Sequence, residues 1–183
     1  MKVPAIGFGS MTAATLLAIG VVVGGCSSPA PPSTNYGNLL VNPNDVWDTT
    51  AYSAAAPVQN PDGQTGVRDV YTHRDKTRQI TDTVLVLSDT SAATASLKQS
   101  QAGLGNRVVN GKTQPAPVGT GGTIVSGPSP DGSKSVSVLL FVEGKAATTV
   151  EFTGPTKDPI PPDTVAEFGQ AQDTAIKKGL PAD

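Results

Sequence analysis

The chain has 183 residues, with 15 acidic and 13 basic side chains and a formal net charge of −2, and it contains no block of lysine or arginine. A nucleic-acid-binding protein uses such a block to hold phosphates, so this class of partner is excluded, and the length suits a single folded domain. Glycine (20) and proline (16) are frequent, as turns and linkers require.

The first 25 residues are predicted to be a secretory signal peptide. Lys2 supplies one positive charge, residues 3–25 carry none, and the stretch 16–23 is the most apolar. A retained membrane-spanning helix is the alternative, because an uncharged run of this length could cross a bilayer. Glycines and hydroxyl residues within the run favour cleavage, as does the absence of a positive charge between the end of the run and Arg68.

Cys26 is the only cysteine, and Val23-Gly24-Gly25-Cys26 resembles the lipobox of bacterial lipoproteins. In that family the bond before the cysteine, here Gly25–Cys26, is cut and the thiol receives diacylglycerol. The resemblance implies lipid attachment at Cys26 and a position on the extracytoplasmic side of the cell membrane. Two acyl chains are enough for stable anchoring. The alternative is a small buried cysteine with no special role.

Residues 26–38 are predicted to be the lipidated cysteine and a tether, in which SSPAPPST (27–34) reads as an extended spacer. Residues 39–183 are predicted to form one domain. Asn42 and Asn44 could cap a short helix containing Trp47, which is expected to anchor in the core. The segment 57–66, rich in proline, asparagine and glycine, is expected to be a loop.

A β-hairpin is predicted from two apolar stretches that flank the charged turn 73–78. Residues 66–73 form the first strand, and alternation at Ile80, Val84 and Val86 marks the second. A helix is predicted over 91–105, because the N-cap residues 88–91 precede an alanine-rich segment. Residues 105–133 are rich in turn residues and contain one short apolar piece at 123–125.

The strongest strand pattern is SKSVSVLLFVEGKAATTVEF (133–152), which predicts a hairpin turning at Glu143-Gly144. A last helix is predicted over Pro162–Lys178, with Gly179 and Pro181 as its stop signal. Four positions of this helix share one stripe: Val165, Phe168, Gln172 and Ile176. The element order predicts an α+β fold, with an antiparallel sheet of about four or five strands and two main helices packed on one face. Any groove is expected on the face opposite the helices.

The sequence contains few side chains in patterns that are typical of a catalytic site or a metal site. A Ser-His-Asp triad or a zinc site would have to use His73, the only histidine, which is expected to be an exposed turn residue. Gly111-Lys112-Thr113 resembles the end of a phosphate-binding loop, but Asn106 stands where the required glycine would be. A hydrolase is therefore disfavoured, and no metal or cofactor is expected.

Asp69 and Asp82 interrupt two otherwise apolar strand faces and could be cross-strand neighbours. The favoured interpretation pairs them instead with Arg68 or Arg78 on the solvent side of the hairpin. Three cations at the hairpin tip could contact anionic lipid or a partner, although a solvated turn is favoured. These cations are Arg74, Lys76 and Arg78.

Several stretches together resemble small lipoproteins of mycobacteria and related actinobacteria: the VGGC motif (23–26), the tether, TVLVLSDTSAATASL (83–97) and VLLFVEGKAATTVEF (138–152). NLLVNPNDV (38–46) is similar to the opening of the extracellular sensor-type domain of the kinase PknH. That resemblance implies an α+β fold with a cleft that senses a ligand. The paired cysteines of those domains have no counterpart after Cys26.

The sequence therefore predicts a non-enzymatic, membrane-anchored domain that binds a small-molecule or lipid ligand in a groove between sheet and helix. The alternative is a scaffold module that contacts an envelope protein without a small ligand. An enclosed apolar cavity with convergent polar groups would favour the first, and an exposed apolar patch the second.

Overall fold

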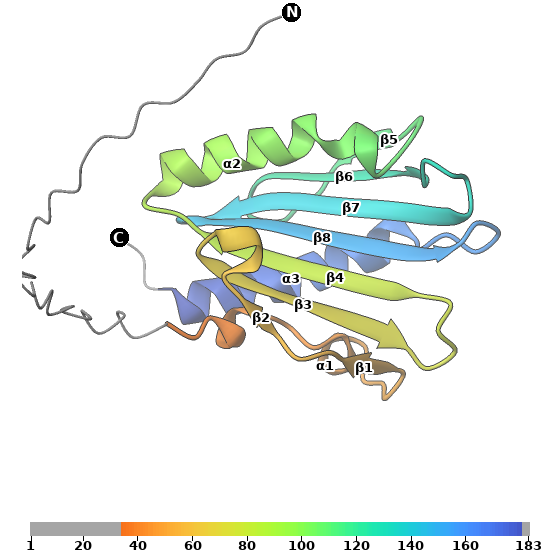
Figure 1. The fold of residues 1–183 in the computed structure, drawn as a ribbon, viewed down its shortest axis with the longest axis horizontal. Helices are drawn as coiled ribbons and strands as arrows, with labels where there is room; N and C mark the ends of the chain where they lie inside the picture. The colour runs from red at the N-terminus through yellow and green to blue at the C-terminus, as the bar shows by residue number, and fades with distance from the viewer. Residues whose placement is uncertain (1–33, 181–183) are drawn as a thin grey trace, which may run out of the picture. The chain divides into compact units, whose positions relative to one another are not determined.

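In a computed structural model, which describes residues 34–180, the chain folds around one antiparallel sheet in the order β1-β3-β4-β8-β7-β6-β5, with β2 also paired to β3 (Figure 1). The described strands are β1 (Tyr52–Ala54), β2 (Val58–Gln59), β3 (Gly66–His73), β4 (Gln79–Val86), β5 (Lys112–Pro115), β6 (Thr120–Pro128), β7 (Lys134–Glu143) and β8 (Ala146–Pro155). The predicted signal peptide, Cys26 and residues 27–33 of the tether lie outside the described residues.

Three α-helices accompany the sheet: α1 (Pro43–Val46), α2 (Thr90–Ala102) and α3 (Pro162–Gly179). Short 3-10 turns are η1 (Gly37–Leu39), η2 (Pro61–Gly63) and η3 (Leu104–Asn106). Within residues 34–180, no helix is both long and apolar enough to cross a bilayer.

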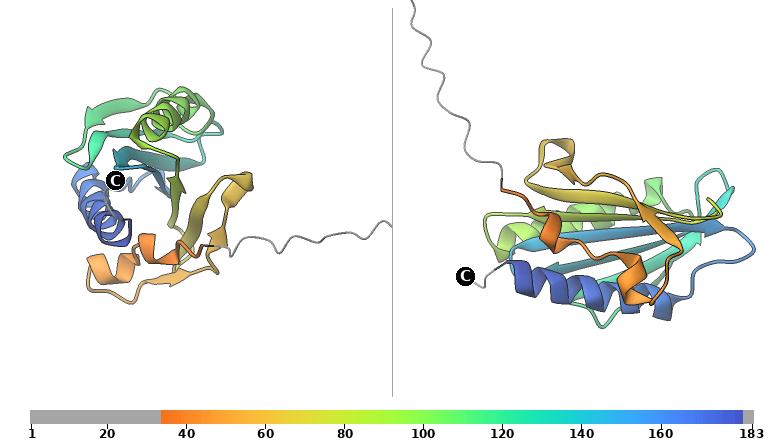
Figure 2. Two further views of the ribbon diagram at one scale, coloured as in Figure 1. Left: turned by 90° about the vertical axis from the view of Figure 1, so that its left-hand side faces the viewer. Right: turned by 90° about the horizontal axis from the view of Figure 1, so that it is seen from below.

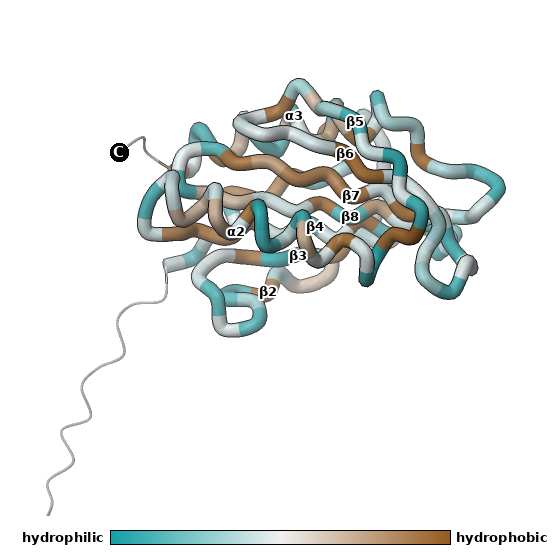
Figure 3. The backbone as a smooth tube through the Cα atoms, turned by 90° about the horizontal axis from the view of Figure 1, so that it is seen from above, coloured by the Kyte–Doolittle hydropathy of each residue, from teal (hydrophilic) through white to brown (hydrophobic). Residues whose placement is uncertain are grey.

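The two long helices lie on opposite faces of the sheet, so the prediction that both pack on one face is wrong. The cause is visible in β7, where both sets of alternating residues are apolar (Figure 3). Val138 and Leu140 contribute to the core under α2, whereas Leu139 and Phe141 contribute to the core under α3. A strand buried on both faces reads as a continuous apolar run, and each face needs its own cover.

The core on the α3 side is the larger, and the sheet curves around it (Figure 2). All four positions of the predicted α3 stripe are buried, and Phe168 packs edge-on against Phe152 at a ring separation of 5.6 Å. Gly169 explains how closely α3 approaches β7. A Cβ atom at that position would lie 2.4 Å from Leu139 Cδ2, so a larger residue would push the helix away.

Gln172 is a polar side chain buried among apolar ones, and its amide group hydrogen-bonds the N-terminal segment to α3. The Val41 N–H donates to Gln172 Oε1 at 3.1 Å, and Gln172 Nε2 donates to the carbonyl of Leu39. Leaving such buried groups without partners would cost about 1–3 kcal/mol each. Trp47 also holds this segment, as predicted: its ring contacts Phe168 and its Nε1 donates to Glu167 Oε2.

The predicted number of four or five strands is too low. The strands that were not predicted are short or show no alternation of apolar and polar residues. The predicted β3, β4, β7 and β8 are all present, and α2 and α3 match their predicted ranges closely. The segment 57–66, expected to be a loop, contains β2 and η2. Every residue of β5 is exposed, so its sequence, KTQP, lacks the apolar residues that mark a strand with one buried face.

Candidate functional site

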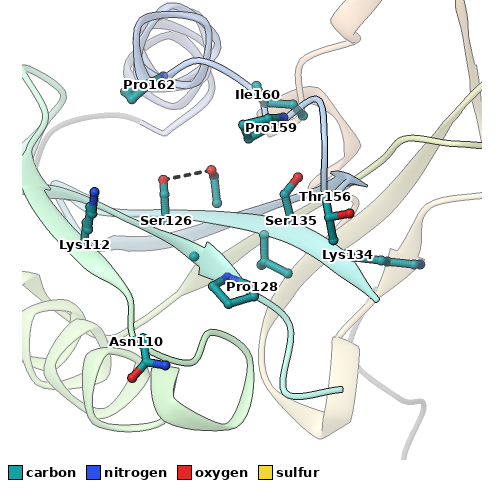
Figure 4. Close-up of a pocket in the computed structure, with 13 residues that line it drawn as sticks. Asn110, Lys112, Ser126, Pro128, Lys134, Ser135, Thr156, Pro159, Ile160 and Pro162 are labelled. Atoms are coloured by element: carbon teal, nitrogen blue, oxygen red, sulfur yellow. Dashed lines mark hydrogen bonds between the residues drawn. The ribbon is translucent and has the colours of Figure 1, made fainter. Parts of the chain in front are cut away.

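A pocket of about 360 Å³ lies between strands β5–β7 and the segment that leads into α3 (Figure 4). We call it the β5–β7 pocket. It lies on the α3 face of the sheet and includes Pro162, the first residue of α3. The expectation of a groove on a face without helices is therefore wrong, whereas this position agrees with the expected groove between sheet and helix. Its lining residues are Asn110, Lys112, Ser126, Gly127, Pro128, Lys134, Ser135, Val136, Ser137, Thr156, Pro159, Ile160 and Pro162.

One wall of the β5–β7 pocket is apolar and poor in hydrogen-bond donors. Pro159, Ile160 and Pro162 face the strand hydroxyls across the cavity (Figure 4). Proline has no backbone N–H, so two of these three residues offer only carbon surface and a carbonyl. This wall can pack against an apolar part of a ligand but offers few hydrogen-bond donors to a polar part.

The opposite wall is a polar row that runs across three strands. Lys112 on β5 pairs directly with Ser126 on β6, and Ser126 pairs with Ser137 on β7. Directly paired residues project from the same sheet face, with Cβ atoms about 5 Å apart. The two serine hydroxyls hydrogen-bond to each other at 2.8 Å, and Ser137 is buried. A few polar groups beside an apolar wall are typical of small-ligand sites.

No local sequence pattern indicates these residues as a site. Lys112 belongs to the Gly111-Lys112-Thr113 segment, which lacks the glycine of a phosphate-binding loop, and the serines belong to strands whose pairing cannot be deduced from local sequence. Their only signal is that Ser135 and Ser137 place small polar residues on the α3 face of β7, just before that face becomes apolar at Leu139. Register between strands, which brings Lys112 to Ser126, is not encoded locally.

Asp69 and Asp82 are direct cross-strand partners on β3 and β4, which confirms that part of the sequence interpretation. The favoured solvent-side pairing is wrong. The flanking Val67, Tyr71, Ile80 and Val84 all lie in the core under α3, so both carboxyls point inward, and they are 5% and 0% exposed.

Neither oxygen of the Asp82 carboxyl has a hydrogen-bond partner, whereas Asp69 Oδ1 accepts from the Val70 N–H at 2.7 Å. Burial raises the pKa of Asp82 well above its usual range, and the neighbouring Asp69 raises it further. The nearby Val41 N–H opposes this shift. Burial also raises the pKa of Asp69. Because two adjacent buried carboxyls resist ionising together, Asp82 holds its proton to higher pH than an exposed aspartate does.

The arginines expected to neutralise this pair are engaged elsewhere. Arg68 contacts Asp62 at 3.1 Å, and Arg78 forms an ion pair with Asp158. Arg74 and Lys76 are exposed at the hairpin tip.

His73 is not the exposed turn residue that the sequence suggested. Its side chain is only 20% exposed, its ring packs edge-on against Tyr52, and its Nδ1 lies 2.7 Å from Asp75 Oδ1. Within residues 34–180, no three histidine, cysteine or acidic side chains are grouped as a metal site requires.

No protein-family model and no curated protein sequence matches the chain. Among solved structures, the fold is similar to the extracellular domain of PknH from Mycobacterium tuberculosis, with a TM-score of 0.55 and 13% sequence identity. The match covers 76% of this chain and 93% of that chain. At this identity the similarity shows the fold alone. It confirms the predicted structural resemblance to the PknH extracellular domain.

Proposed function

We propose that this protein is a lipid-anchored extracytoplasmic domain that binds a small or lipidic ligand in the β5–β7 pocket. Three observations support the proposal: the lipobox ending at Cys26, a fold shared with the extracellular domain of a kinase, and the pocket itself. The pocket is the observation that carries the ligand-binding part, because its polar row and apolar wall face one cavity (Figure 4).

A binding role fits the described residues better than a catalytic or a scaffold role. The pocket lining contains no histidine or acidic residue to act as a general base. A scaffold without a ligand would be expected to present an apolar patch. Among the described residues, Val58 is the exposed large hydrophobic side chain, and one residue does not make a patch.

The test compares what co-purifies with the wild-type protein and with a pocket-filling variant, Ser126→Leu. Ser126 is half-buried and points into the cavity, so leucine would occupy ligand space (Figure 4). Each protein is purified from its own host's membranes and extracted with organic solvent. Covalently attached lipid stays with the chain, whereas a bound ligand enters the extract and is identified by mass spectrometry.

We expect a defined compound near one equivalent in the wild-type extract and at least a tenfold loss in Ser126→Leu. Ser53→Leu is the matched control, because it makes the same change at an exposed position of β1, away from the pocket. An extract that is empty for the wild type, or equally rich for all three proteins, would contradict ligand binding in this pocket. Thermal melts establish that each variant is folded.

A further inference from the structure

We infer that the β5–β7 pocket selects a single-tailed amphiphile with an anionic head, a carboxylate or a phosphate, and that Lys112 and the Ser126–Ser137 pair bind the head. This inference rests on the proposed function and specifies its ligand. It depends on three features: the unused hydrogen-bond capacity of the serine pair, the charge of the lining, and the size of the cavity.

The serine pair has a hydrogen-bond donor to spare. Two hydroxyls carry two protons, and the bond between Ser126 Oγ and Ser137 Oγ uses one of them. Neither hydroxyl has another partner among the described residues. By contrast, Ser135 Oγ already donates to the carbonyl of Pro155 at 3.1 Å. The remaining proton of the pair is thus available to an acceptor atom of the ligand.

The charge of the lining favours an anion as that acceptor. The pocket is lined by two lysines and by no acidic residue. Lys112 is the cross-strand neighbour of Ser126 and makes no ion pair with any residue of the described domain. Asp163, in the first turn of α3, does not line the cavity. Hydrogen bonds to a charged group are roughly twice as strong as those between neutral groups, so an anionic head gains most from this row.

The side chains of Lys112 and Lys134 point in different directions, so substitution of Lys134 is a control for substitution of Lys112. Figure 4 shows the Lys112 side chain rising on the same side of the sheet as the serine hydroxyls, while Lys134 extends away from the cavity. Both residues are exposed and both lie on strands that border the pocket. A specific contact to the head would need Lys112, whereas a general electrostatic attraction would use both.

The cavity fits a single tail. Small-molecule pockets range over about 300–1,000 Å³, and the β5–β7 pocket, near 360 Å³, lies at the lower end. The apolar wall of Pro159, Ile160 and Pro162 stands opposite the polar row, so one chain can lie against it while its head reaches the serines (Figure 4). A diacyl lipid would need more room.

The test measures the binding of four probes below their micellar concentrations: dodecanoate, dodecyl phosphate, dodecanol and dodecyltrimethylammonium. The full-length protein is used in nanodiscs of neutral lipid, with empty nanodiscs to subtract probe that partitions into the bilayer. We expect at least one anionic probe to bind at least tenfold more tightly than the alcohol, which corresponds to about 1.4 kcal/mol. The anion that binds more tightly identifies the source of the head, a fatty acid or a lipid phosphate. Raising the ionic strength should weaken its binding.

Lys112→Gln should reduce the affinity for the anionic probe about tenfold and leave that for dodecanol unchanged, whereas Lys134→Gln, whose side chain extends away from the cavity, should have a much smaller effect on the anionic probe. Equal binding of all four probes, abolished in Ser126→Leu, would overturn the anionic head while preserving the pocket. Equal losses in Lys112→Gln and Lys134→Gln would also overturn it. If no probe binds to the wild type, both this inference and the proposed lipid-type ligand are wrong.

Discussion

Asp82→Asn is expected to stabilise the domain at about pH 8 and to bring no gain at about pH 4. In the folded protein the pKa of Asp82 is raised, chiefly by burial and then by Asp69. The folded state therefore binds the proton more tightly than the unfolded state, in which the pKa is close to 3.8. The resulting stability is fully present below that value and is lost as the pH rises through the raised folded pKa.

Within this window, each pH unit lowers the free energy of unfolding by about 1.4 kcal/mol for one proton. For a domain of this size, that corresponds to a fall in melting temperature of about 3–6 °C. Asparagine resembles the protonated aspartate in shape and cannot ionise, so the variant should have the flatter stability profile. Asp69→Asn should also flatten the profile, since it removes one group with a raised pKa and the charge facing Asp82.

The titratable group that acts with the pair is Tyr71, on the same face of β3, which in turn is influenced by the exposed Asp45 of α1. Burial first, and Asp82 next, raise the pKa of Tyr71, so it stays neutral across this range. Denaturant unfolding from about pH 4 to pH 9 measures the profile. A wild-type profile that is flat, or an Asp82→Asn variant less stable than the wild type at every pH, would contradict the proton-holding role of Asp82.

Asp131→Asn serves as a control of opposite sign. Asp131 is exposed in the turn between β6 and β7, where hydrogen bonds from Ser129 and then Ser133 lower its pKa to about 2. Stability from a lowered pKa is present above the unfolded value and is lost as the pH falls. This variant should therefore lose stability at neutral pH and none at low pH.

Cys26→Ser is expected to move the mature protein from the detergent-rich phase to the aqueous phase in a phase-partition experiment. Each buried methylene contributes about 0.8 kcal/mol, so loss of a diacylglyceryl group removes the dominant membrane affinity. Ser28→Ala is the matched control, because it changes one hydroxyl in the same segment and leaves the lipobox intact.

Immunoblots of both phases give the distribution and the size of each species. Accumulation of a larger, uncleaved precursor would also agree with the account, since the predicted cleavage site is the Gly25–Cys26 bond. Partition of Cys26→Ser into the detergent-rich phase at the wild-type mature size would contradict lipid attachment at Cys26.

Local sequence patterns predicted the elements whose residues bury a regular face. The alternation in β3 and β4, the capping residue Asp89 of α2 and the buried stripe of α3 are all properties of consecutive residues. The predicted turn is also present between β7 and β8, where Gly144 has a positive φ. By contrast, β5 is wholly exposed and gave no such pattern.

The features that the sequence did not reveal depend on how the strands assemble. Leu139 and Phe141 on the α3 side, with Val138 and Leu140 on the α2 side, make β7 apolar on both faces, which is typical of a sheet covered on both sides. Asp69 and Asp82 could be recognised as possible cross-strand neighbours because each interrupts an apolar strand face. Which face they occupy depended on α3 and the N-terminal segment covering that side. The row from Lys112 to Ser137 exists only through the pairing of β5, β6 and β7.

The most direct test of ligand binding in the β5–β7 pocket is a crystal structure of the protein purified from its own host's membranes. We predict elongated non-protein electron density along Pro159, Ile160 and Pro162, with one end within hydrogen-bond distance of Ser126 or Ser137. A cavity holding only water, while a co-purified compound occupies another site, would contradict the account.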